Sequence, residues 1–174
     1  MILSDVDIAA EYASTRLGIA PYDPRCVQPA SYDVHLSSDF IEPLGNDRTR
    51  RYDGTDIVLE PMQFLLGSTI ETLSIPSHIV ARVEGKSSLA RIGLMVHITA
   101  GFVDPGFIGN VTLELLNVSR APVTLVAGMK IAQISFHRLE TPCARPYGSP
   151  GLMSKYQHSV GTVSSQHTAI KVKG

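Results

Sequence analysis

Residues with the types and spacing for chemistry gather between Glu84 and Glu114. Gly85-Lys86-Ser87-Ser88 follows a run that alternates polar and apolar residues, and it precedes a short helical pattern. Backbone N–H groups at a helix start, two hydroxyls and a lysine form a compact anion site, which suits phosphate. A P-loop is excluded, because Val80 stands where that motif needs its first glycine. The competing interpretation of a lone Gly-Lys-Ser is a surface turn.

Arg91 and Glu114 are candidates for acid–base chemistry. Ser87 and Arg91 are spaced i, i+4, so both lie on one face of the expected helix. Glu114 lies between Leu113 and Leu115 in an alternating run. It is either a carboxylate at the rim that faces water, or a partly buried base that Arg91 orients. The pattern leaves both interpretations open.

Four more polar residues have weaker local signals. Asp104-Pro105-Gly106 is typical of a turn. His97 falls within an expected strand, Leu94–Thr99, where a lone histidine is most often structural; the alternative is that it gates the access of water. Tyr147 and Lys155 lie in a stretch rich in Pro, Gly and Ser. On a segment that closes over a ligand, both would bind phosphate.

Zinc and cysteine chemistry are not predicted. Cys26 and Cys143 are far apart and form no metal motif, redox motif or disulfide framework. A zinc deaminase needs His-x-Glu and Pro-Cys-x-x-Cys, but Thr99 follows His97 where the glutamate should stand, and Pro146 replaces the second cysteine. A nucleophile elbow and a dinucleotide fingerprint are also missing. We therefore expect a water molecule activated by a carboxylate, without protein-bound zinc.

The bulk composition suits one globular domain. The chain has 174 residues, of which 44% are hydrophobic and 18% charged, with a net charge of −1. This balance does not predict binding to nucleic acid or to an anionic membrane surface. No apolar run approaches the roughly 18 residues that span a bilayer, and the start lacks the pattern of a signal peptide. We expect a cytoplasmic protein.

The elements that must position these residues are mostly short strands separated by Gly and Pro, a pattern typical of a β-sandwich or barrel. Ser4 predicts the cap of a short N-terminal helix that ends near Ala13, and Ser87–Ile92 predicts one internal helix. Residues 1–141 form the expected β domain, and residues 142–174 form a tail that either frays or closes over a ligand. Strands are expected at Tyr32–Leu36, Asp56–Leu59, Phe64–Glu71, Val80–Val83, Leu94–Thr99, Val111–Leu115, Val123–Val126 and Lys130–His137.

Taken in order, these motifs resemble the dCTP deaminase family, which shares its fold with the trimeric dUTPases. The resemblance runs nearly end to end and is strongest in Val83-Glu84-Gly85-Lys86-Ser87-Ser88-Leu89-Ala90-Arg91, in Thr99 through Phe107, and in Thr112-Leu113-Glu114. It implies a mainly β, distorted β-barrel or jelly-roll-like homotrimer whose sites are shared between subunits. It also implies dCTP or dUTP as substrate, dTTP as a possible inhibitor, and Mg²⁺ carried on the triphosphate.

The resemblance further implies roles for single residues. Glu114 would be the general base, taking a proton from the attacking water and delivering it to the pyrimidine. Arg91 and Ser87 would position that glutamate and the exocyclic amine, and the Ala100 backbone would help to hold the water. The implied nucleotide-binding residues are Lys86, Ser87, Ser88, Arg91, Ala100, Asp104, Thr112, Leu113, Glu114, Gln133, Tyr147 and Lys155.

Gly101-Phe102 bears on the product. Deaminase-only bacterial members of the family have His-Arg at this place, whereas members that also cleave the triphosphate have Gly-Phe. The resemblance therefore implies that dCTP becomes dUMP and diphosphate, with Asp104 activating the second water. The alternatives are a deaminase that releases dUTP, a dUTPase without deamination, and a nucleotide-sensing module without turnover.

Two positions depart from the family pattern. Ser159 stands where the family usually has a phosphate-binding glutamine, which puts the grip of the tail on the triphosphate in question. His35 stands where arginine is common, which could alter a subunit or loop contact. Neither departure involves Glu114 or Arg91.

Overall fold

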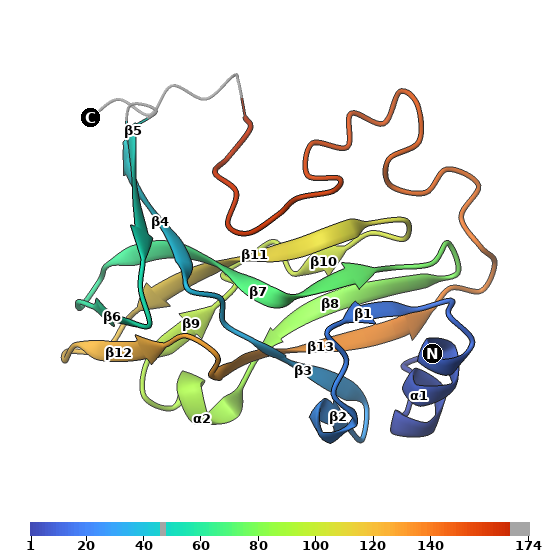
Figure 1. The fold of residues 1–174 in the computed structure, drawn as a ribbon, viewed down its shortest axis with the longest axis horizontal. Helices are drawn as coiled ribbons and strands as arrows, with labels where there is room; N and C mark the ends of the chain where they lie inside the picture. The colour runs from blue at the N-terminus through green and yellow to red at the C-terminus, as the bar shows by residue number, and fades with distance from the viewer. Residues whose placement is uncertain (46–47, 168–174) are drawn as a thin grey trace.

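Two antiparallel sheets share one apolar core in the computed structural model, which describes residues 1–45 and 48–167 (Figure 1). The first sheet has the order β5 (Arg48–Asp53), β4 (Asp39–Gly45), β7 (Phe64–Ser74), β11 (Ile108–Asn117) and β9 (Leu94–Val96), with β1 (Gly18–Ala20) also paired to β7. The second has the order β10 (Phe102–Val103), β8 (Ile79–Gly85), β13 (Lys130–Arg138), β3 (Ser31–His35) and β2 (Val27–Gln28). A ribbon of β12 (Val123–Val126) and β6 (Asp56–Leu59) completes the strands of the described residues.

Three short helices accompany the sheets in the described part of the chain: α1 (Asp5–Ala13), a 3₁₀ turn η1 (Pro24–Cys26) and α2 (Ser87–Ala90). The mainly β, jelly-roll-like fold with one N-terminal and one internal helix is confirmed, although the two sheets do not close into a barrel there. None of these helices is long and apolar enough to cross a bilayer.

The predicted start of α1 is confirmed by its cap. The Ser4 hydroxyl accepts a hydrogen bond from the Asp7 backbone N–H at 3.3 Å, and the Asp7 carboxylate accepts one from the Ser4 N–H at 3.3 Å. This reciprocal capping box satisfies donors that the first helical turn leaves without partners.

Strand β11 shows how sequence alternation orients the site. Val111, Leu113 and Leu115 are buried in the core, whereas Thr112 and Glu114 point to the opposite face and are half-buried. Because successive strand residues face opposite sides, the apolar residues that fix β11 in the core also direct Glu114 away from it.

Two sequence predictions are wrong in extent, and one feature was missed. The strand expected at Leu94–Thr99 ends at Val96, because His97 has a positive φ of 63° that strand geometry does not allow. The helix expected over Ser87–Ile92 ends at Ala90, with Arg91 as its C-cap. The β4–β5 hairpin was not predicted.

A buried carboxylate ties α1 to the second sheet. Glu11 is 1% exposed and accepts hydrogen bonds from Arg16 at 2.8 Å and Arg138 at 2.9 Å, with His78 Nε2 at 3.2 Å. Burial raises the pKa of Glu11, but the hydrogen bonds from Arg16, His78 and Arg138 outweigh it and lower the pKa from 4.5 to about 2. The charged form of Glu11 therefore stabilises the folded chain.

Glu11→Gln is expected to destabilise the fold at neutral pH by an amount that shrinks in acid. A carboxyl whose pKa is depressed from 4.5 to about 2 contributes fully above pH 4.5, and the contribution is lost as the pH falls toward 2. The shift corresponds to a stabilisation on the order of 3 kcal/mol at neutral pH. Urea unfolding of both chains from pH 7 to pH 3 measures the difference, and a difference independent of pH would contradict this origin.

Candidate active site

A cavity of about 1030 Å³ opens on the outward face of β11, and we call it the β11 cavity. Its walls come from β7, β11, the segment after β9 and the tail, which runs past β11 in orange and red in Figure 1. Predicted site residues that line it are His97, Ala100, Phe102, Asp104, Thr112, Glu114 and Tyr147. The side chain of Leu113 faces the core, so only its backbone is on this side of the strand.

His97 is an unusual member of the β11 cavity. Both ring nitrogens are buried and have no hydrogen-bond partner among the described residues. Its backbone N–H donates to the Glu114 carbonyl at 2.8 Å, which holds the two residues together. A buried polar atom without a partner costs on the order of 1–3 kcal/mol, so the His97 ring would be stabilised by a partner outside the described residues, such as a water molecule.

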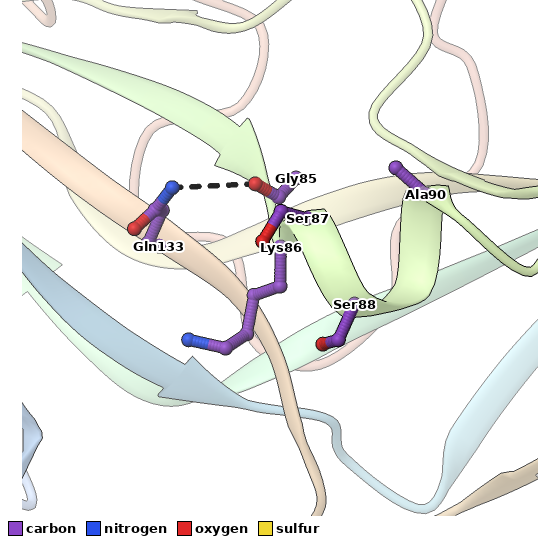
Figure 2. Close-up of a pocket in the computed structure, with 6 residues that line it drawn as sticks. All are labelled: Gly85, Lys86, Ser87, Ser88, Ala90 and Gln133. Atoms are coloured by element: carbon purple, nitrogen blue, oxygen red, sulfur yellow. Dashed lines mark hydrogen bonds between the residues drawn. The ribbon is translucent and has the colours of Figure 1, made fainter.

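A second, smaller cavity of about 370 Å³ lies at the start of α2, and we call it the α2 cavity. It is lined by Gly85, Lys86, Ser87, Ser88, Ala90 and Gln133 (Figure 2). Gln133 is fixed there because its amide donates to the Gly85 carbonyl at 3.3 Å, and its oxygen accepts from the Ser31 hydroxyl at 3.1 Å. No side chain caps the first turn of α2, which leaves the backbone N–H groups of Ser87 and Ser88 available to an anion, whereas the Leu89 N–H already donates to the Lys86 carbonyl at 3.0 Å.

Lys86 reaches the α2 cavity while bound to a buried carboxylate. Its ammonium lies 2.5 Å from Asp33 Oδ1, and Lys130 lies 3.2 Å from the other oxygen of Asp33. The Asp33 side chain is only 4% exposed. Two lysines around one carboxylate leave a net positive charge beside the cavity, which favours an anionic ligand.

The two halves of the predicted site are separate within one chain. Ser87 lines the α2 cavity, Glu114 lines the β11 cavity, and Arg91, which is exposed at the end of α2, lines neither. In Figure 1, α2 lies below β9, and the tail passes above β11. No contact between Arg91 and Glu114 is present among the described residues, and their pairing stays a prediction.

The tail contributes to the β11 cavity more than its sequence indicated. Tyr147 lines the cavity, and its hydroxyl accepts a hydrogen bond from the Tyr156 N–H at 3.0 Å. Ser159 also lines it and pairs with Gly109 as a parallel bridge to β11. Lys155 lines neither cavity. The last part of the predicted tail, 168–174, lies outside the described residues.

Some lining residues were missed from the sequence. Arg48 on the β4–β5 hairpin and Val163 to Ser165 in the tail also line the β11 cavity. No local motif marks them, since only long-range packing brings the hairpin and the tail to β11.

Gly101 allows the segment after β9 to approach β8 closely. Its carbonyl accepts a hydrogen bond from the Val83 N–H at 2.8 Å. A Cβ atom at position 101 would lie 2.9 Å from the Val83 carbonyl oxygen, closer than real Cβ contacts allow. The neighbouring Phe102 pairs with Arg82 of β8, and its side chain is 59% exposed. The glycine thus sets where the following residues, including Asp104, lie.

The described residues contain no group of three or more His, Cys, Asp or Glu side chains that could hold a metal ion.

His35, which stands where the family commonly has arginine, is accommodated within the chain, because its Nδ1 lies 2.6 Å from the buried carboxylate of Glu71.

Comparison with known proteins adds independent information. A family model described as dCTP deaminase-like matches residues 2–139. The chain is 46% identical, over an alignment 182 residues long, to a protein of Mycobacterium ulcerans named "dCTP deaminase, dUMP-forming", and the match covers 95% of each chain.

Solved structures agree on the fold. The 2'-deoxycytidine 5'-triphosphate deaminase of Agrobacterium tumefaciens is similar with a TM-score of 0.66 and 25% identity, over 79% of this chain and 47% of that one. The dUTPase of Staphylococcus bacteriophage 80alpha has a TM-score of 0.52 and 17% identity, over 75% of this chain and 95% of that one. At this identity, the phage enzyme shows the fold alone.

Proposed function

Because the chain belongs to the dCTP deaminase-like family, we propose that it deaminates dCTP and also cleaves the triphosphate, giving dUMP and diphosphate. The high identity to a dUMP-forming relative over nearly the whole length of both chains supports this product. The observation that carries the proposal is the β11 cavity, where Glu114 and Asp104 line one space large enough for a nucleotide.

The first reaction is attack of water at C4 of cytosine. Glu114 takes a proton from the water as its oxygen bonds to C4, and delivers a proton to N3, where negative charge develops. Glu114 then takes the proton of the new C4 hydroxyl and delivers it to the amino group, so that the C4–N bond breaks, ammonia leaves and C4 becomes the carbonyl carbon of uracil. His97 contacts the water or the base through a ring nitrogen that otherwise has no partner. The Ala100 backbone lies beside them in the same cavity.

The complete site is shared between subunits of a homotrimer. Arg91 and Ser87 of one subunit meet Glu114 of the next, which fits a chain in which Ser87 and Glu114 line two different cavities. Across that contact, Lys86, Ser88 and the first turn of α2 bind phosphate, and Gln133 keeps the cavity in shape. Closed homo-oligomers repeat one such contact around their axis.

The second reaction is attack of water on the α-phosphorus, which releases diphosphate and leaves dUMP. Asp104 activates this water, and Tyr147 and Lys155 of the tail contact the phosphates. Mg²⁺ carried on the triphosphate would lower the charge of its oxygens. Carried in this way it needs no cluster of three protein ligands. dTTP would inhibit by occupying the same pyrimidine and phosphate contacts.

Gly101→Ala is expected to slow diphosphate release more than ammonia release, so that dUTP accumulates. The added Cβ would lie 2.9 Å from the Val83 carbonyl oxygen, and the displaced segment carries Asp104 with it. Gly54→Ala is the matched control, because its Cβ would meet nothing closer than 3.7 Å. The ratio of dUTP to dUMP measures the effect. An unchanged ratio in Gly101→Ala would contradict the role of this position.

The proposal is tested by incubating the purified chain with dCTP and Mg²⁺ and measuring ammonia. Release of ammonia is the expected result. Nucleotide binding without ammonia release would overturn deamination. The remaining alternatives would then be a dUTPase and a nucleotide sensor. Incubation with dUTP distinguishes them, because only a dUTPase releases diphosphate.

A further inference from the structure

Three residues of segment 159–163, namely Ser159, Gly161 and Val163, are hydrogen-bonded to β11. Asn110 N–H donates to the Ser159 carbonyl at 3.0 Å, and the Ser159 hydroxyl donates to the Asn110 carbonyl at 2.8 Å. The Gly161 N–H donates to the Asn110 side chain at 3.0 Å, and the Val163 N–H donates to the Thr112 hydroxyl at 3.2 Å. These contacts bring the tail onto the strand that carries Glu114.

The strongest attachment comes from the β4–β5 hairpin. Arg51 donates two hydrogen bonds to the Asp39 carboxylate, at 2.7 and 2.8 Å, in the bidentate geometry that favours strong ion pairs. Arg51 also donates to the Thr162 carbonyl at 2.9 Å. The Thr162 N–H donates to Asp39 Oδ2 at 2.8 Å, and its hydroxyl donates to the Asp39 carbonyl at 2.5 Å. Thr162 is 2% exposed as a result.

The tail is shaped to accept this contact at Gly161. The residue has a φ of 65°, a conformation that favours glycine, and a Cβ there would lie 2.7 Å from Asp39 Oδ2. A side chain at this position would push the tail away from Asp39.

We propose that Asp39, Arg51 and Thr162 form a latch that holds the tail over the β11 cavity, so that the β4–β5 hairpin positions the tail for nucleotide binding. Ser159 and Val163 flank the latched residue, and both line the cavity with Glu114. The latch therefore acts together with the β11 contacts to hold this wall of the cavity in place. Asp39 and Arg51 line no part of either cavity and act through the tail as positioning residues.

The same contacts explain what Ser159 does in place of the family glutamine. Its side chain and its backbone both bond to Asn110, so this position secures the tail to β11. Two sets of protein contacts therefore hold the tail: those from β11 to Ser159, Gly161 and Val163, and those from the latch to Thr162.

The first test is hydrogen exchange of the ligand-free chain, read at the peptide that contains Gly161, Thr162 and Val163. Arg51→Gln removes the contacts to Asp39 and Thr162 and is expected to speed exchange there by about tenfold or more. Arg50→Gln is the matched control, because Arg50 neighbours Arg51 on β5 but bonds to Tyr52 and Glu42 instead of the tail. Exchange in Arg50→Gln should equal that of the original chain.

A second variant acts from the tail side. Gly161→Ala leaves the hairpin sequence intact and is expected to speed exchange of the same peptide, which keeps the test valid if Arg51→Gln folds poorly. Equal exchange in Arg51→Gln, Gly161→Ala and Arg50→Gln would overturn the latch.

The consequence for activity rests on the proposed function. A contact between the tail and the nucleotide that has the same strength in the substrate complex and in the transition state affects KM and leaves kcat unchanged. Arg51→Gln should therefore raise KM for dCTP about tenfold and change kcat less than about twofold. Faster exchange with an unchanged KM would overturn the positioning role. If the original chain releases no ammonia, the proposed function fails, and the exchange measurement still decides the latch.

Discussion

Glu114→Gln is expected to abolish the release of ammonia from dCTP and to leave nucleotide binding in place. Glutamine has nearly the shape of glutamate, so the half-buried position on β11 and the walls of the cavity stay as they are. It cannot take a proton from water, however, and general base catalysis contributes about 10²–10⁴-fold to a rate. Because the same carboxylate also protonates N3, we expect a loss at the upper end of that range.

Glu140→Gln is the matched control, because Glu140 is exposed and lines neither cavity. Ammonia release by a coupled assay and the Kd for dCTP by calorimetry separate catalysis from binding. A Glu114→Gln chain that releases ammonia at the original rate would refute the assigned base.

Chains that carry Arg91→Gln and chains that carry Glu114→Gln are each expected to be inactive, but to regain activity when they assemble together. If Arg91 of one subunit meets Glu114 of the next, a mixed trimer contains some sites in which both residues are intact. Random assembly of equal amounts gives about a quarter of such sites, because each needs the right chain on both sides of a cyclic interface. The expected recovery is far above the residual activity of either parent.

The mixing experiment has two controls. Native mass spectrometry establishes that the subunits have exchanged, and a mixture of Arg91→Gln with a chain that carries both substitutions should stay inactive. Absence of recovery in exchanged trimers would mean that Arg91 and Glu114 do not meet across subunits.

Local patterns predicted the parts of the fold that depend on local physics. Ser4 and Asp7 marked the start of α1, because a capping box needs only neighbouring residues. Alternation on β11 pointed Glu114 away from the core, because a one-residue shift would expose Leu113 and Leu115.

Features that depend on distant partners escaped prediction. β5 is polar and Pro43 interrupts β4, so neither strand has an apolar alternation; cross-strand pairs such as Phe40 with Tyr52 join them. The positive φ of His97 and the placement of Ser87 and Glu114 in two different cavities likewise arise from the packing of the chain, which no short motif encodes.

The most direct test of the account is the balance of products from dCTP in the presence of Mg²⁺. One site that performs both reactions predicts that ammonia and diphosphate form at equal rates, with dUMP as the nucleotide product and no build-up of dUTP. Ammonia that forms while dUTP accumulates and diphosphate stays absent would contradict it.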